Sequence, residues 1–86
     1  MNDEQLILKA YVEASSYRER ALKSIGEDTI TPKQIAMNSQ IRQNHISKTL
    51  KELKEHELVE CINEEMRKGR LYRLTPLGMK ILSEMN

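Results

Sequence analysis

The side chains best suited to molecular recognition lie on the polar side of an expected amphipathic helix that starts near Arg42. At about 100° per residue, Ile46, Leu50 and Leu53 fall within about 60° of one another, which is the pattern of one buried face. Amide, hydroxyl and cationic groups occupy the remaining positions, where they can form hydrogen bonds or contact an anion. A solvated helix surface would show the same pattern, so the neighbouring segments must decide between the two interpretations. The candidate residues are Arg42, Gln43, Asn44, His45, Ser47, Lys48 and Lys51.

A second basic segment spans residues 66–80, which carry five basic residues and no acid. Polar residues and Gly69 separate two short apolar segments, 58–63 and 71–74, and this pattern predicts a β-hairpin with a basic tip. Cations at such a tip can contact phosphates, although a solvated turn that protects a sheet edge would also be polar. The candidate cations are Arg67, Lys68, Arg70 and Arg73, of which the last can instead pair with Glu60 across the hairpin.

Capping signals position both segments within a mostly helical chain. Residues 3–14 and 16–25 are expected helices, and the second can be capped by Ser15 or Ser16 and ended by Gly26.

Two Thr-Pro pairs start further helices. In "TPKQ", Thr31 can cap, Pro32 fits the first helical position and Gln34 completes a capping box, so a short helix should run to about Asn38. The helix whose apolar face holds Ile46, Leu50 and Leu53 should then span 42–56. The second pair starts a last helix, 76–86, whose apolar residues are Leu77, Ile81, Leu82 and Met85.

Composition excludes several classes of protein. The chain has 86 residues, of which 38% are hydrophobic and 31% charged, and this fits a single globular domain, 1–86, with a net charge of +1. One cysteine, Cys61, excludes an intrachain disulfide and fits a reducing compartment, so a cytoplasmic location is expected. No apolar run is long enough to cross a membrane, and no secretion signal appears.

Catalytic and metal chemistry are not expected. The sequence has no nucleophile–base arrangement, phosphate-binding loop or glycine-rich fingerprint, so we expect no enzyme and no cofactor. His45 and His56 lack a neighbouring cysteine or carboxylate pattern, which argues against a metal site. Cys61 is expected to be a small core or edge residue rather than a redox sensor.

Three motifs in order, "TPKQIA", "HISKTLKELKEHELVE" and "KGRLYRLTPLG", resemble the winged helix-turn-helix transcriptional regulators, most closely small archaeal members akin to the MarR and ArsR groups. The similarity covers roughly residues 16–85. It implies a mainly α fold with a small β-hairpin (α+β): a winged-helix core over 16–75, built from three helices and a wing, with extra helical segments at 1–14 and 76–86.

The resemblance also implies a function. Helix 42–56 would be a recognition helix in the DNA major groove, the wing 64–72 would contact phosphates or the minor groove, and the terminal helices would pair into a homodimer on double-stranded DNA. The amides of Gln43 and Asn44 match adenine, and Arg42 can reach guanine or phosphate. The alternative is a winged-helix module for protein–protein interaction in a transcription or RNA-processing assembly. The sequence identifies no small-molecule effector.

Two turns depart from the family's pattern. The family often has glycine where this chain has Gln40 and Glu57. Because a non-glycine residue at positive φ costs about 1 kcal/mol, we expect a different turn shape at both positions.

Overall fold

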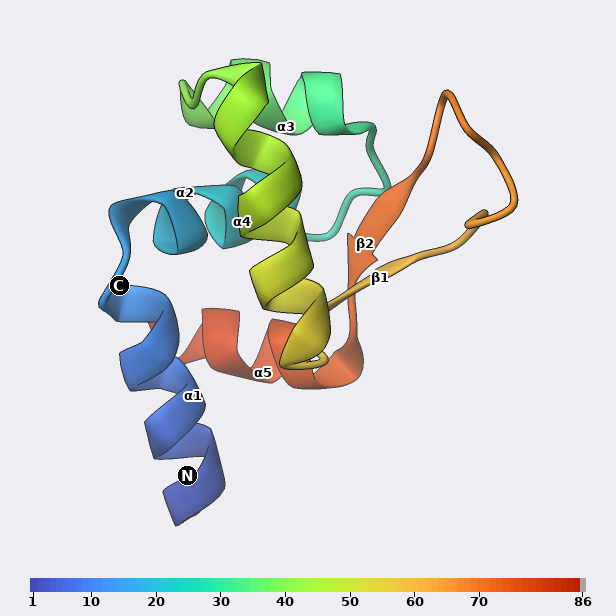
Figure 1. The fold of residues 1–86 in the computed structure, drawn as a ribbon. Helices are drawn as coiled ribbons and strands as arrows, with labels where there is room; N and C mark the ends of the chain where they lie inside the picture. The colour runs from blue at the N-terminus through green and yellow to red at the C-terminus, as the bar shows by residue number, and fades with distance from the viewer. Residues whose placement is uncertain (86) are drawn as a thin grey trace.

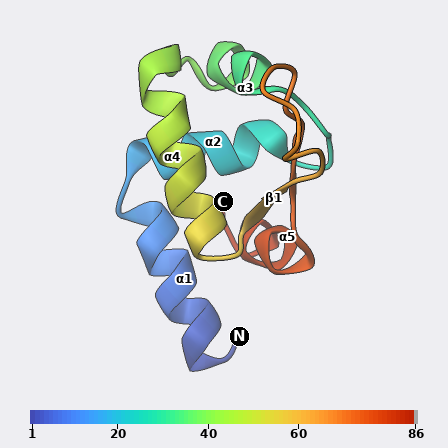
Figure 2. The same ribbon diagram turned by 45° about the vertical axis from the view of Figure 1, so that its right-hand side comes forward.

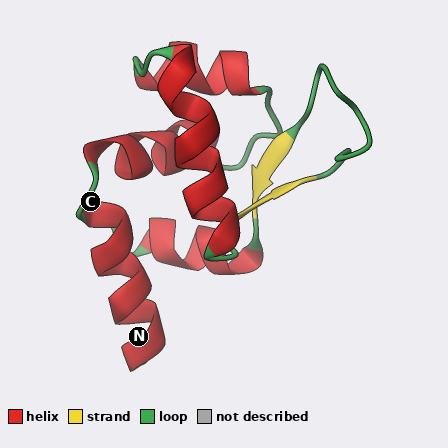
Figure 3. Cartoon of the chain, in the orientation of Figure 1, coloured by secondary structure: helices red, strands yellow, loops and turns green. Residues whose placement is uncertain are grey.

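The computed structural model describes residues 1–85 as five helices and a two-stranded hairpin (Figures 1 and 3). The elements follow the predicted order: α1 (Asp3–Glu13), α2 (Ser16–Ile25), α3 (Pro32–Ser39), α4 (Gln43–Glu55), β1 (Val59–Cys61), β2 (Tyr72–Leu74) and α5 (Pro76–Ser83). None of the described helices combines the length and apolarity needed to cross a membrane.

The helices begin where the capping signals predicted. Ser15 accepts a hydrogen bond from the backbone amide of Arg18 at 3.3 Å, and Thr75 accepts one from that of Gly78 at 2.9 Å. Thr31 and Gln34 form the predicted reciprocal capping box at the start of α3. These caps satisfy backbone amides that have no partner within the helix, so each fixes a helix start locally.

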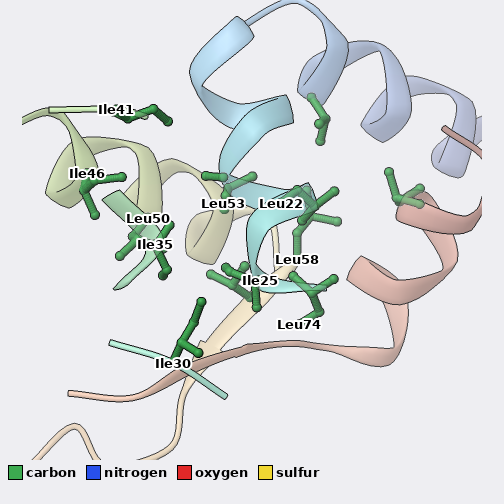
Figure 4. Packing of buried hydrophobic residues seen from close by; sticks show 14 of the residues in the cluster. Leu22, Ile25, Ile30, Ile35, Ile41, Ile46, Leu50, Leu53, Leu58 and Leu74 are labelled. Atoms are coloured by element: carbon green, nitrogen blue, oxygen red, sulfur yellow. The ribbon is translucent and has the colours of Figure 1, made fainter. Parts of the chain in front are cut away.

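The core is centred on α2, which lies below α3 and beside α4 in Figure 1, and it extends to buried residues of α1, the hairpin and α5. The residues of the predicted apolar face of α4, Ile46, Leu50 and Leu53, are all buried, and they point toward α2 and α3 (Figure 4). Burying each such side chain contributes about 1.5–3 kcal/mol. The remaining residues of the cluster include Leu22, Ile25, Ile30, Ile35, Ile41, Leu58 and Leu74.

The hairpin is shorter than the sequence predicted. Strands β1 and β2 pair antiparallel with Glu60 opposite Arg73, and Ile30 adds an isolated bridge to Tyr72. Beyond β1 the side chain of Asn63 replaces ladder bonds: its Oδ1 accepts from the Leu71 amide at 2.8 Å, and its Nδ2 donates to the Gly69 carbonyl at 3.1 Å. The backbone pairing continues only as one bond, from the Ile62 amide to the Leu71 carbonyl at 2.9 Å. The rest of the connection from residue 62 to residue 71, here called the wing loop, closes without regular strand pairing.

At both turns that flank α4, the structure contradicts the expected change of turn shape. Gln40 (φ 58°, ψ 35°) and Glu57 (φ 59°) adopt positive φ although neither is glycine. After α4, the amide of Leu58 donates to the Leu53 carbonyl at 2.9 Å and that of Glu57 donates to the Lys54 carbonyl at 3.0 Å, which is a Schellman motif. At Glu57 the expectation was wrong because the hydrogen bonds of this motif and the burial of Leu53 and Leu58 outweigh a strain of about 1 kcal/mol.

Gly78 allows α5 to approach the start of the hairpin. A Cβ at this position would lie 2.0 Å from the carbonyl oxygen of Leu58, which is backbone and cannot move aside. The same carbonyl accepts from the Thr75 amide at 3.1 Å. The glycine of "LTPLG" therefore sets the contact between α5 and the residue that precedes β1.

The terminal helices complete the molecule. Helix α1 extends away from the three-helix core (Figure 2) and buries Leu8 and Val12. Helix α5 ends at Ser83, earlier than the predicted 86, because the amide of Glu84 turns back to the carbonyls of Ile81 and Leu82. Asn86 lies outside the described residues.

Candidate nucleic-acid interface

The polar face of α4 is open to solvent. Arg42 is the N-cap residue but makes no capping hydrogen bond with its side chain, so its guanidinium is free to contact a partner. Within the described residues, the side chains of Gln43, Asn44 and Lys48 make no hydrogen bond or ion pair. All seven α4 candidates are exposed: Arg42, Gln43, Asn44, His45, Ser47, Lys48 and Lys51.

His45 is the member of this set that has a ring partner. Its ring lies 5.2 Å, centroid to centroid, from that of Tyr17 on α2, with 41° between the ring planes. Tyr17 itself is exposed, and the two rings border a shallow hollow that also includes Lys48. This contact holds His45 toward α2, at one edge of the outer face of α4.

The C-terminal half of α4 is engaged within the molecule. Glu52 pairs with Arg18 at 3.6 Å, and the His56 ring stacks on Tyr11 with centroids 3.9 Å apart. The Arg18 guanidinium also lies 3.9 Å from the Tyr11 ring centroid. Burial raises the pKa of the Tyr11 hydroxyl above its ordinary value, although Arg18 opposes the shift. The free, basic part of α4 thus lies before Glu52 and ends at Lys51.

The four hairpin cations fall into two groups. Arg70 braces the wing loop, because its Nε donates to the Met66 carbonyl at 2.7 Å and its Nη2 to the Glu64 carbonyl at 3.1 Å. Arg73 pairs with Glu60 at 3.5 Å, which is the predicted alternative to a phosphate contact. Arg67 and Lys68 are exposed and have no ion pair within residues 1–85.

A basic groove runs between α3, α4 and the wing loop. Two hollows of about 530 Å³ and 280 Å³ form it, and both are lined by Pro32, Ser47, Arg70 and Tyr72. Lysine and arginine side chains border the groove on every side, whereas no carboxylate lines it among the described residues. The bordering cations are Lys33, Lys51, Lys54, Arg67, Lys68 and Arg70.

Two of these cations, Lys33 and Lys54, were not among the site residues predicted from the sequence. Lys54 belongs to the helix but lies beyond the predicted polar segment, and it pairs with Glu64 of the wing loop. Lys33 follows Pro32 in the capping segment, whose pattern predicted only the start of a helix. The signal that could have found it is the start of α3, where the positive end of the helix dipole favours a contact with anions.

Metal ligation receives no support. Among residues 1–85, no group of three or more His, Cys, Asp or Glu side chains is arranged to hold a metal ion. Cys61 is half-buried in β1, with its Sγ 3.6 Å from Asn63 Oδ1.

Comparison with known proteins supports the resemblance seen in the sequence. The structure is similar to the crystal structure of a MarR family transcription regulator, with a TM-score of 0.67 and 29% sequence identity over 88% of this chain and 56% of that one. No protein-family model and no curated protein matches the chain. The fold is thus a MarR-like winged helix, and this chain spans just over half the length of that regulator.

Proposed function

We propose that the chain is a sequence-specific, double-stranded DNA-binding transcriptional regulator. Helix α4 enters the major groove by its N-terminal half, and Arg67 and Lys68 of the wing loop contact phosphates or the minor groove. The observation that carries the proposal is the row of exposed, unpartnered polar side chains on α4 beside a basic groove, on a MarR-like fold.

The chemistry of the outer face favours DNA over a protein partner. A protein interface normally has an apolar centre, whereas the exposed positions of α4 carry amides, a hydroxyl and cations. The amides of Gln43 and Asn44 can make paired hydrogen bonds to adenine, and Arg42 can contact guanine or phosphate. Arg70 and Arg73 stabilise the hairpin through their own contacts, so we assign them a supporting role.

Selection of bound sequences from a random duplex library tests the proposal. An enriched motif is expected. If the protein retains duplexes without enriching any sequence, the role is architectural and the sequence-specific function is wrong.

Asn44→Ala tests whether α4 reads bases. Removing a base contact should weaken binding to the selected site by about 1–3 kcal/mol and relax the preference at one base pair, with little change on unrelated DNA. Fluorescence anisotropy on both duplexes provides the measurement. Asn38→Ala, which removes an exposed amide from α3, is the matched control and should bind both duplexes like the wild type. Equal losses on the two DNAs for Asn44→Ala would contradict base reading.

A further inference from the structure

We propose that DNA binding by this chain is linked to protonation: His45 of α4 takes up a proton from solvent when the duplex binds, and Tyr17 of α2 is the positioning residue for its ring. The inference rests on the proposed function and deepens it. It adds a response to pH, and it gives α2 a part in DNA recognition.

Three planar groups in a row hold the His45 ring against α2. The Arg20 guanidinium lies 5.3 Å from the centroid of the Tyr17 ring, and the centroids of the Tyr17 and His45 rings are 5.2 Å apart. Tyr17 and Arg20 stand three residues apart on α2, so they share one face of that helix. Within residues 1–85, the side chains of Gln43 and Asn44 have no comparable partner. In the first turn of α4, the imidazole is therefore the polar group that is held in place before DNA arrives.

Positive charges dominate the surroundings of His45. Arg42 and Lys48 stand three residues before and after it, so both lie on its side of α4. Among the described residues, the one carboxylate that lines the hollow beside His45 is that of Glu52, which is already paired with Arg18 at 3.6 Å. An imidazolium in the free protein therefore has no unpaired carboxylate to stabilise it in this hollow. The charged or titratable groups around His45 are Tyr17, Arg18 and Arg20 of α2 and Arg42, Lys48 and Glu52 of α4.

Duplex DNA supplies the negative charge that this site lacks. The duplex carries about one phosphate charge per 1.7 Å of helix axis, and its purines present acceptors in the major groove. His45 is exposed between Arg42 and Lys48, so entry of the first turns of α4 brings its ring within reach of these groups. Because an imidazolium donates from both ring nitrogens and a neutral imidazole from only one, the bound state favours the protonated form. Affinity must therefore rise as the pH falls.

The composition of the chain allows the proton to be assigned. His45 and His56 are its two histidines, and histidine is the side chain that ordinarily changes charge between about pH 5 and 8. His56 lies at the opposite end of α4, where its ring stacks on Tyr11, so it is outside the proposed DNA-binding surface. His56→Gln is therefore the matched control for His45→Gln.

Binding isotherms from about pH 5.5 to 8, with the selected duplex at constant salt, test the inference. The wild-type affinity should rise with acidification, by at most about tenfold per pH unit, which is the limit for one proton. His45→Gln should still bind the duplex but with a flat profile, and His56→Gln should follow the wild type. Calorimetry in buffers of different ionisation enthalpy gives a second readout: the heat of binding should depend on the buffer for the wild type and not for His45→Gln.

Two variants of Tyr17 test its positioning role. Tyr17→Phe keeps the ring and should keep the wild-type pH profile, whereas Tyr17→Leu removes the ring contact and should flatten the profile. Circular dichroism at both ends of the pH range checks that each variant is folded. A wild-type pH profile for folded Tyr17→Leu would overturn the role of Tyr17.

The outcomes separate this inference from the proposed function. Sequence-specific binding by the wild type with no dependence on pH would overturn the proton link and leave the proposed function standing. A pH dependence that persists in His45→Gln and disappears in His56→Gln would assign the proton to the far end of α4 and overturn the inference as well. A wild-type protein that binds no duplex at any pH would overturn the proposed function and this inference together.

Discussion

Gln40 and Glu57 hold left-handed backbone conformations at the two ends of α4. At each end the chain reverses tightly: Ile41 donates to the Ala36 carbonyl at 3.1 Å before the helix, and Leu58 donates to that of Leu53 at 2.9 Å after it. The strain therefore lies in the turns that set the direction of α4. Because tertiary contacts can impose this geometry on a residue with a side chain, the missing glycines were a poor guide to turn shape.

Glu57→Gly should stabilise the protein. Left-handed backbone costs a non-glycine residue about 1–2 kcal/mol, and glycine loses about 0.5–1 kcal/mol through its greater freedom in the unfolded chain, so a net gain of up to about 1.5 kcal/mol is expected. Urea unfolding gives the free energies. Glu57→Ala is the matched control, because it removes the carboxylate but keeps a Cβ at positive φ. If the alanine variant proved as stable as the glycine variant, backbone strain would not be the cause.

The helices show what local sequence can predict and where it stops. Thr31, Gln34 and Thr75 predicted helix starts correctly because a cap depends on residues within one turn. The placement of Lys33 around one hollow with Arg67 and Lys68 depends instead on the wing loop folding back beside α3, and no local pattern encodes that approach. The basic hairpin was visible in the sequence, but the groove that it forms with α3 was not.

A cluster of rings joins α1 to the end of α4 and predicts a response to alkaline pH. Tyr11 lies between the His56 ring and the Arg18 guanidinium, and burial raises its pKa. For an acid with a folded pKa above the unfolded value, about 10 here, the stabilisation is complete below pH 10 and is lost as the pH rises toward the folded pKa.

Tyr11→Phe should therefore lose less stability than the wild type above pH 10, since it has no hydroxyl to ionise. Urea unfolding at intervals from pH 7 to about pH 11.5 measures the difference. Tyr17→Phe is the control, because Tyr17 is exposed, and its profile should follow the wild type. Parallel profiles for all three proteins would show that burial of Tyr11 does not govern the alkaline transition.

The surface of the whole molecule carries apolar residues that its own core does not cover. Helix α1 buries Leu8 and Val12 but leaves Leu6 and Ile7 with 49% and 69% of their surface exposed. In α5 the apolar residues turn mainly inward, since Ile81 is fully buried and Leu77 and Leu82 pack against the core, as does Met85 just beyond the helix. Of the two terminal helices, α1 therefore leaves more apolar surface for a second copy. Deleting α1 would test this poorly, because Val12 belongs to the core.

A homodimer formed through α1 should dissociate when Ile7 is changed to Lys. One winged helix contacts few base pairs, with an interface of about 600–1,000 Å², whereas a two-fold dimer would place two recognition helices about 34 Å apart on an inverted-repeat site. Light scattering at micromolar concentration should give a dimer for the wild type and a monomer for Ile7→Lys, with weaker binding to the inverted repeat. Met37→Lys is the control, because Met37 on α3 is also 69% exposed, and it should remain dimeric. A monomeric wild type that selects a site without two-fold symmetry would rule out the dimer, and the exposed residues of α1 would then have no part in DNA recognition.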